Sequence, residues 1–125
     1  MRRLSKEEVI SIHEKLIHRF GGIPGFDENT IELCLYQPFQ TFDGVDLYLN
    51  DLHKVCLTSY LIIKKHPFKD GNKRVGMLLL ILGLRQHGYR FNLSNEKTIE
   101  LGLKLADNTW GLSELITLME KLQDK

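Results

Sequence analysis

The chain lacks the features that mark several classes of protein. It has two cysteines, Cys34 and Cys56, and both fall in apolar helical patterns, which predicts buried thiols rather than a disulfide. No C-x-x-C pair or cysteine–histidine cluster indicates a zinc site. The net charge is only +1, so direct nucleic-acid binding through a broad basic surface is not expected.

Long hydrophobic runs are also missing. The longest, residues 75–84, is about half the length that a membrane-spanning helix requires. Residues 1–5 lack the apolar core of a signal peptide. We therefore expect a cytoplasmic protein that does not contact a membrane. The length and the 42% apolar content predict one globular domain over residues 1–125.

Apolar residues recur at helical spacing along most of the chain, which predicts an all-α fold. A compact helical domain is expected around the helix of residues 72–86, because its middle is apolar on every side and should be enclosed by other helices. Gly76 and Gly83 would allow one of these helices to approach closely. The predicted helix N-caps are Ser5, Asp27, Asn50 or Asp51, Ser94 and Ser113.

Two stretches fit a helix poorly. Residues 38–48 contain strand-forming side chains around Asp43-Gly44, a pair typical of tight turns, so we predict a small hairpin or flap. Residues 89–93 are predicted to form a short strand.

The segment from His66 to Arg74 is the strongest candidate for a functional site. It lies between two predicted helices, and residues 64–74 carry five cations against one acid. His66 is the natural general base, since imidazole titrates near neutral pH. Pro67 ends the preceding helix and fixes the turn, and Phe68 is predicted to anchor the loop in the core.

The second half of this segment suits a phosphate group. Asp70 offers oxygen ligands for Mg²⁺, and Gly71 lets an anion approach the backbone. The N–H groups of Asn72, Lys73 and Arg74 would face an anion at the helix N-terminus. A base, a metal ligand and an anion site together suit transfer of a phosphoryl or nucleotidyl group to a hydroxyl.

Simpler interpretations remain open for these residues. A loop between two helices often contains Asp-Gly-Asn, and its lysines are usually solvated. The segment is not a P-loop, because the earlier spaced glycine is missing. His13 lies on the apolar side of the first predicted helix and is interpreted as a core or boundary residue rather than a ligand.

The segment resembles the signature of the Fic/Doc (Fido) superfamily, H-x-F-x-[DE]-[AG]-N-[GK]-R. The matching positions are His66, Phe68, Asp70, Gly71, Asn72, Lys73 and Arg74. The turn at residues 21–25, the short length and the order of the helices are similar to the Doc (death-on-curing) toxins. Lys73 stands where the AMP-transferring members have a second glycine, while Pro67 and Gly71 are closer to the Fic version.

This resemblance implies the toxin of a type II toxin–antitoxin system. It would transfer phosphate from ATP to a threonine or serine hydroxyl of a target, elongation factor Tu, and so arrest translation. His66 would be the catalytic base and Asp70 the Mg²⁺ ligand, with Pro67 and Phe68 as structural parts of the motif. The hairpin at residues 38–48 would dock the target. The phosphates would be bound by Lys69, Gly71, Asn72, Lys73 and Arg74.

Two other functions stay open. One is transfer of AMP to a protein hydroxyl by the same pocket, and the other is a non-catalytic binding module. The inhibitory pattern [ST]-x-x-x-E-[GN] of many Fic proteins does not occur in this sequence. The resemblance therefore implies inhibition in trans by a Phd-like antitoxin, whose helix would occupy an exposed apolar groove.

Overall fold

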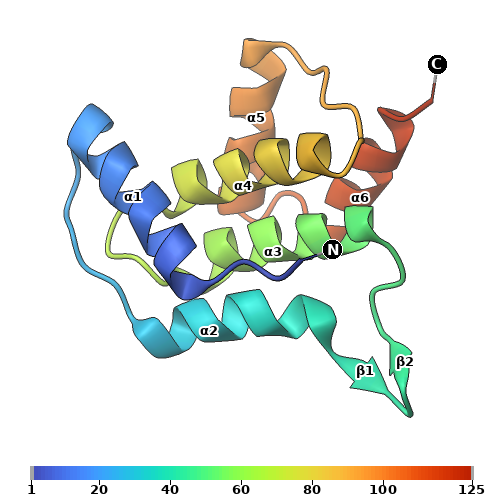
Figure 1. Cartoon of the computed structure of the whole chain (residues 1–125). Helices are drawn as coiled ribbons and strands as arrows, with labels where there is room; N and C mark the ends of the chain where they lie inside the picture. Colours follow the sequence, from blue (N-terminus) through green and yellow to red (C-terminus); the bar gives the residue numbers. More distant parts are fainter. Residues whose placement is uncertain (1, 125) are drawn as a thin grey trace.

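The computed structural model describes residues 2–124, and these residues form six α-helices, one short 3₁₀ helix and a two-stranded hairpin (Figure 1). The prediction of an all-α fold with a small hairpin is confirmed. The elements in chain order are α1 (Lys6–Phe20), α2 (Glu28–Tyr36), η1 (Gln37–Phe39), β1 (Thr41–Phe42), β2 (Val45–Asp46), α3 (Asp51–Lys65), α4 (Asn72–Gln86), α5 (Asn95–Ala106) and α6 (Leu112–Lys121).

Four of the predicted N-caps are present in the structure. The side chains of Ser5, Asp27, Asn50 and Ser94 each accept a hydrogen bond from a backbone N–H in the first turn of the helix that follows. The prediction for the last helix is wrong, because Gly111 is its N-cap. The backbone N–H of Gly111 donates to the Glu114 carboxylate at 2.7 Å.

Helices α3 and α4 lie side by side at the centre, and the other helices pack on both sides of this pair (Figure 1). Gly76 and Gly83 make the close approach possible, as predicted. A Cβ on Gly76 would lie 2.5 Å from the Ile63 side chain, and one on Gly83 would lie 2.8 Å from Val55. The Ser59 hydroxyl also donates to the carbonyl of Gly76 at 2.7 Å.

Two hydrophobic clusters flank this central pair. One joins α3 and α4 to α5 and α6, and the other joins them to α1, α2 and Phe68. The complete enclosure predicted for α4 is not found, since Leu82 is 49% exposed. Helix α3 is the more enclosed of the two, with ten buried residues against seven in α4.

Residues 89–93 form no strand, contrary to the prediction. This segment runs beside the end of α6, where the Gln123 side chain accepts from the Arg90 N–H at 2.8 Å and donates to the Arg90 carbonyl at 3.0 Å. A single side chain therefore supplies the backbone partners that a neighbouring strand would have provided.

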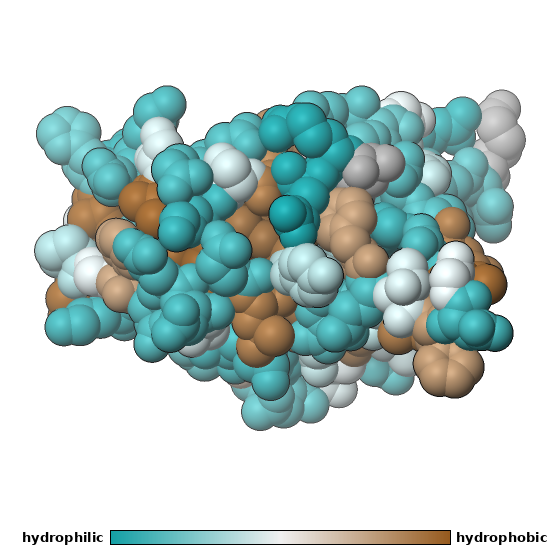
Figure 2. Space-filling view, turned by 60° about the horizontal axis from the view of Figure 1, so that its bottom comes forward, coloured by the Kyte–Doolittle hydropathy of each residue, from teal (hydrophilic) through white to brown (hydrophobic). Residues whose placement is uncertain are grey.

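The hairpin pairs Thr41 with Asp46 and Phe42 with Val45. Lys54 on α3 holds it in place, because its buried ammonium donates to the Asp46 carboxylate and to the carbonyl of Tyr48. Figure 2, which brings this end of the molecule forward, shows hydrophobic surface on the hairpin. The exposed apolar side chains there are Phe42, Val45, Leu47 and Leu49.

Both cysteines are buried and free, as predicted. Among the described residues, no helix is long and apolar enough to cross a bilayer.

Candidate active site

The segment from His66 to Arg74 forms the loop between α3 and α4 and the first turn of α4. His66 follows the last residue of α3 and adopts the left-handed conformation with φ 53° and ψ 57°. The helix therefore ends where Pro67 was predicted to end it. The His66 side chain is exposed, whereas Pro67 and Phe68 are buried. The loop thus presents the imidazole to solvent while the next two residues hold the chain in the core.

Asn72 fixes the shape of this loop. Its side-chain oxygen accepts from the Phe68 N–H at 2.9 Å, and its amide nitrogen donates to the Phe68 carbonyl at 2.8 Å. The same nitrogen lies 3.5 Å from Nδ1 of His66. Asn72 is buried, and its side chain is occupied by these loop contacts. Its backbone N–H is therefore the group that it can offer to an anion.

The segment after α1, residues 21–27, runs beside the loop. The Asp27 N–H donates to the Pro67 carbonyl at 2.8 Å, and the Lys69 N–H donates to the Gly25 carbonyl at 3.0 Å. Phe26 also packs edge-on against Phe68, with 6.4 Å between the ring centroids. These contacts join the two segments as a short antiparallel bridge, so the turn at 21–25 forms one wall of the site.

Asp70 is held by backbone groups on both of its carboxylate oxygens. Oδ1 accepts from the Gly71 N–H at 2.9 Å, and Oδ2 accepts from the Ile23 N–H at 3.1 Å. Gly22 makes room for this carboxylate, since a Cβ at that position would lie 2.9 Å from Oδ2. The backbone carbonyl of Asp70 is also bonded, to Nε2 of His13 at 2.7 Å.

The Asp70 carboxylate suits a magnesium ion that arrives with a nucleotide. Each of its oxygens has a second acceptor position beyond the bond described above, and the side chain is exposed to the pocket. Mg²⁺ in nucleotide sites is typically held by one or two carboxylates together with phosphate oxygens and water. Among residues 2–124 no group of three or more His, Cys, Asp or Glu side chains could form a protein cage for a metal.

The N-terminus of α4 has an unusual charge pattern. Each of the other five described helices has an acidic residue in its first turn. In the described residues, α4 has no acid there and no side-chain cap, and its first turn carries Lys73 and Arg74. Gly71 precedes it with φ 84°. Cations at the positive end of a helix dipole are unfavourable, and a bound anion would offset them.

A polar pocket opens over this helix end. The Arg74 side chain packs over the Phe20 ring, with its guanidinium carbon 4.9 Å from the ring centroid. The pocket is lined by Phe20, Gly21, Gly22, His66, Lys69, Asp70, Gly71, Asn72, Lys73 and Arg74.

The structure brings seven of the nine predicted site residues into this pocket lining. The exceptions are Pro67 and Phe68, which lie in the core beneath it. Sequence reasoning missed Phe20, Gly21 and Gly22 as parts of the wall. The Gly-Gly pair before the Ile-Pro-Gly turn could have indicated them, because paired glycines permit close approach of another segment.

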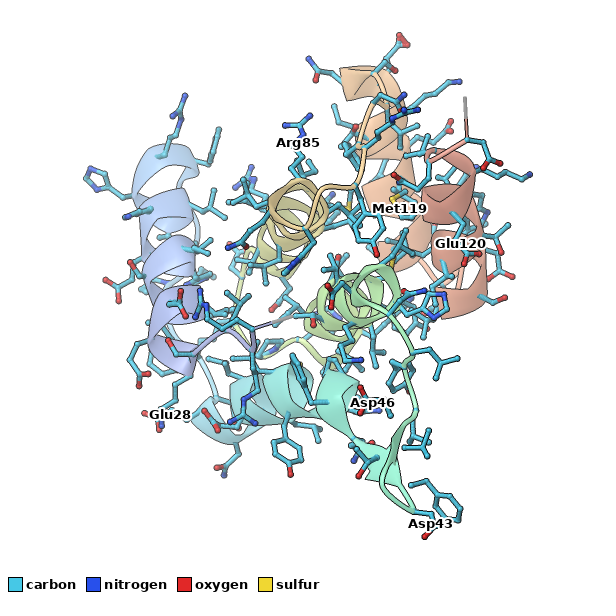
Figure 3. The ribbon with its side chains drawn as sticks, turned by 45° about the vertical axis from the view of Figure 1, so that its right-hand side comes forward. Glu28, Asp43, Asp46, Arg85, Met119 and Glu120 are labelled. Carbon is cyan, nitrogen blue, oxygen red and sulfur yellow. The ribbon has the colours of Figure 1, made fainter. Side chains whose placement is uncertain are left out.

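The hairpin that was predicted to dock the target lies at the opposite end of α3 from His66. The hairpin precedes the first residue of α3, and His66 follows its last residue, so α3 separates them by about 22 Å. Figure 3 shows Asp43 at the hairpin tip, pointing away from the rest of the molecule. Glu28, the first residue of α2, lies on the opposite side of this view. The segment that flanks the site is therefore residues 21–27.

Two comparisons with known proteins found matches. The family model described as "Fic/DOC family" matches residues 3–84, which include the loop and the segment 21–27. The chain is also 33% identical over 90 residues to the protein kinase Doc of Escherichia phage P1, and the match covers 70% of each chain.

Proposed function

This chain belongs to the Fic/DOC family, whose members are typically transferases that use a nucleotide, and from that premise we propose that it is a protein kinase. It would transfer phosphate from ATP to a threonine or serine hydroxyl of a target protein. The proposed target is elongation factor Tu, whose modification would arrest translation. In this proposal the chain is the toxin of a toxin–antitoxin pair, and residues 1–125 form its catalytic domain.

The observation that carries the proposal is the N-terminus of α4. Its backbone N–H groups, Lys73 and Arg74 are all positive groups at one helix end, in a first turn with no acid among the described residues. A polyphosphate would supply the missing negative charge. Lys69 lies in the same pocket wall and adds a third cation. This concentration of positive charge suits the phosphates of ATP far better than a neutral substrate.

The remaining groups suit transfer to a hydroxyl. The hydroxyl oxygen would form a bond to the γ-phosphorus, while the bond from that phosphorus to the β–γ bridging oxygen breaks and ADP leaves. The imidazole of His66, exposed at the pocket wall, would take the hydroxyl proton. Gly71, Asn72, Lys73 and Arg74 would stabilise the charge on the phosphate oxygens.

Asp70 would hold the Mg²⁺ that accompanies the nucleotide. A bound Mg²⁺ neutralises charge on the phosphates during transfer. The chain's own part is to keep the carboxylate in place, through the N–H groups of Ile23 and Gly71.

A second candidate is transfer of AMP by the same pocket. In that reaction the hydroxyl attacks the α-phosphorus and pyrophosphate leaves. Pro67 and Gly71 agree with the AMP-transferring version of the motif, and Lys73 departs from it. We favour the kinase because Lys73 adds bulk and charge at the position where those proteins have glycine.

Labelled ATP separates these reactions. The purified chain is incubated with Mg²⁺, elongation factor Tu and ATP labelled on either the γ- or the α-phosphate. A kinase transfers only the γ-label, and an AMP transferase transfers the α-label. Failure to transfer either label to any protein of a cell lysate would contradict both enzymatic proposals.

The variant His66→Ala tests the alternative of a non-catalytic binding module. Under both enzymatic proposals it removes label transfer and growth arrest, while His18→Ala, a change at an exposed histidine of α1, leaves both intact. Growth arrest that persists in His66→Ala would support the binding module.

The proposed inhibitor is a Phd-like antitoxin that binds away from the pocket. An apolar groove runs between α1, α3 and α4, and its lining shares no residue with the pocket around His66. Leu82, half-exposed in this groove, tests the idea. Leu82→Asp should keep label transfer but escape neutralisation by a co-expressed antitoxin. Full neutralisation of this variant would exclude the groove as the binding site.

A further inference from the structure

His13 is the one histidine of the described chain that is fully enclosed. It projects from α1 and is 3% exposed. Its Nε2 lies 2.7 Å from the backbone carbonyl of Asp70, a residue 57 positions further along the chain. Because a carbonyl oxygen only accepts, Nε2 must carry a proton and donate it.

The same imidazole ring contacts two more residues of the loop. It stacks on Phe68, with 3.9 Å between the ring centroids and 11° between the planes. A Cβ on Gly71 would lie 3.6 Å from Cδ2 and Nε2 of His13, which shows how closely the ring covers that backbone. One side chain of α1 therefore contacts Phe68 and Asp70 and leaves room for no more than a methyl group over Gly71.

These contacts fix the backbone of Asp70, while the N–H of Ile23 fixes its carboxylate. Both holding groups come from α1 and the turn that follows it. Rotation of the Asp70 peptide would break the bond from His13, and rotation of its side chain would break the bond from Ile23. The carboxylate thus points into the pocket in one orientation before any ligand binds.

We propose that His13 is a positioning residue, which acts through Asp70 and sets the affinity of the pocket for Mg²⁺ and its nucleotide. This inference rests on the proposed function, since it assumes that Asp70 is the metal ligand. Two parts of His13 have different roles in this proposal: the Nε2–H group holds the Asp70 carbonyl, and the ring packs on Phe68. The hydrogen-bond donor, rather than the packing of the ring, sets the affinity for Mg²⁺ and its nucleotide.

Paired variants divide these contributions. His13→Phe keeps a ring against Phe68 and removes the donor. His13→Gln keeps an N–H donor of similar reach and removes the ring, and His13→Asn has the same amide on a side chain shorter by one methylene. His18→Phe and His18→Gln are matched controls on the exposed side of the same helix.

The first measurement is calorimetric binding of ADP with Mg²⁺. We expect His13→Phe and His13→Asn to weaken binding by about ten-fold or more, the scale seen when a group supporting a metal ligand is lost. His13→Gln should stay within about three-fold of the original chain, and the His18 variants should bind unchanged. Unchanged binding in a folded His13→Phe or in His13→Asn would overturn the proposal, as would equal losses in the Gln and Asn variants.

Amide hydrogen exchange of residues 66–72 is the second measurement and needs no ligand. Exchange should accelerate in His13→Phe and His13→Asn and stay close to the original rate in His13→Gln. Equal exchange rates in all the folded variants would contradict the proposal that the hydrogen bond from His13 holds the Asp70 backbone in place. If the exchange rates differ as expected but ADP with Mg²⁺ does not bind the unmodified protein, the proposed function fails and the positioning of Asp70 by His13 stands.

Discussion

Lys73 on α4 lies directly against Gly102 on α5. The Cγ and Cδ atoms of Lys73 are each 3.5 Å from the point where a Cβ on Gly102 would stand. Helix α5 follows the part of the chain that the family model matches, residues 3–84. Gly102, which lies outside the matched part, therefore restricts where the Lys73 side chain can run, and Lys73 is the residue that distinguishes the two proposed reactions.

The first prediction concerns this contact. Gly102→Leu should displace the Lys73 stem and lower γ-phosphate transfer on the order of 10- to 100-fold, because small displacements of a site group have effects of this size. Gly102→Ala should remain active, since the added Cβ meets Met77 Cγ at 3.3 Å and the Lys73 stem at ordinary contact distance.

Leu103→Ala, at the half-exposed neighbour on α5, serves as the control for changes in this helix. Rates with γ- and α-labelled ATP are measured for all three variants. A Gly102→Leu variant that folds and transfers phosphate at the original rate would mean that α5 does not govern Lys73.

The second prediction concerns the two glycines after α1. Gly22 has φ 129°, and a Cβ there would lie 2.7 Å from Ile17 and 2.9 Å from the Asp70 carboxylate. Gly22→Ala should therefore cost about 1–3 kcal/mol of stability and also weaken binding of ADP with Mg²⁺.

Gly21→Ala is the matched control, because Gly21 also has a positive φ of 81° but has no atom within 4 Å of the added Cβ among the described residues. It should lose stability and keep most of its nucleotide affinity. Urea unfolding and calorimetry distinguish the two effects, and equal nucleotide affinities in both variants would refute the clash with Asp70.

The third prediction concerns Asn72. Asn72→Asp replaces the amide that donates to the Phe68 carbonyl with a carboxylate that repels it, in a buried position. We expect a loss of about 1–3 kcal/mol in the free energy of unfolding at neutral pH. The exposed Asn95 at the start of α5 provides the same substitution without this penalty. Chemical denaturation of both variants measures the difference, and equal stabilities would rule out the loop contact as a source of stability.

The fourth prediction concerns the buried thiols. Burial raises the pKa of Cys34 to about 11 and that of Cys56 to about 12, from an ordinary value of 9.0. Above about pH 9 the unfolded chain loses these thiol protons and the folded chain keeps them, so stability should fall as the pH rises from about 9 to about 12. The double variant Cys34→Ala, Cys56→Ala should lose stability less steeply over this range in urea titrations.

In the native protein at pH 8, neither thiol should react with an alkylating reagent, because both are buried. Rapid labelling at this pH would contradict their protection.

The sequence predicted those features that depend on neighbouring residues. Ser5, Asp27 and Ser94 cap helices because each bonds to a backbone group three residues away. Pro67 restricts the residue before it, so the end of α3 was also predictable. The loop residues from His66 to Arg74 lie together in space for the same reason, since they are consecutive in the chain.

Contacts between distant residues were not predictable in this way. His13 was interpreted as a core residue, which agrees with its burial, but its partner Asp70 is 57 positions away. The hairpin is joined to α3 by Lys54, a buried lysine whose ion pair with the half-exposed Asp46 nothing in the local pattern indicates. The cap of α6 was missed for a different reason. Gly111 and Glu114 are only three positions apart, but Gly111 has no capping side chain, whereas Ser113 is of a type that often caps helices.

The bare N-terminus of α4 has a consequence for the stability of the whole protein. A helix whose first turn carries two cations and no acid is expected to be less stable at that end, and both hydrophobic clusters pack on this helix. Bound polyphosphate would complete that helix as an N-cap residue does elsewhere, so the substrate would act as a structural part of the fold. ADP or inorganic pyrophosphate should each raise the melting temperature of the protein, by an amount that grows with the ratio of ligand concentration to dissociation constant.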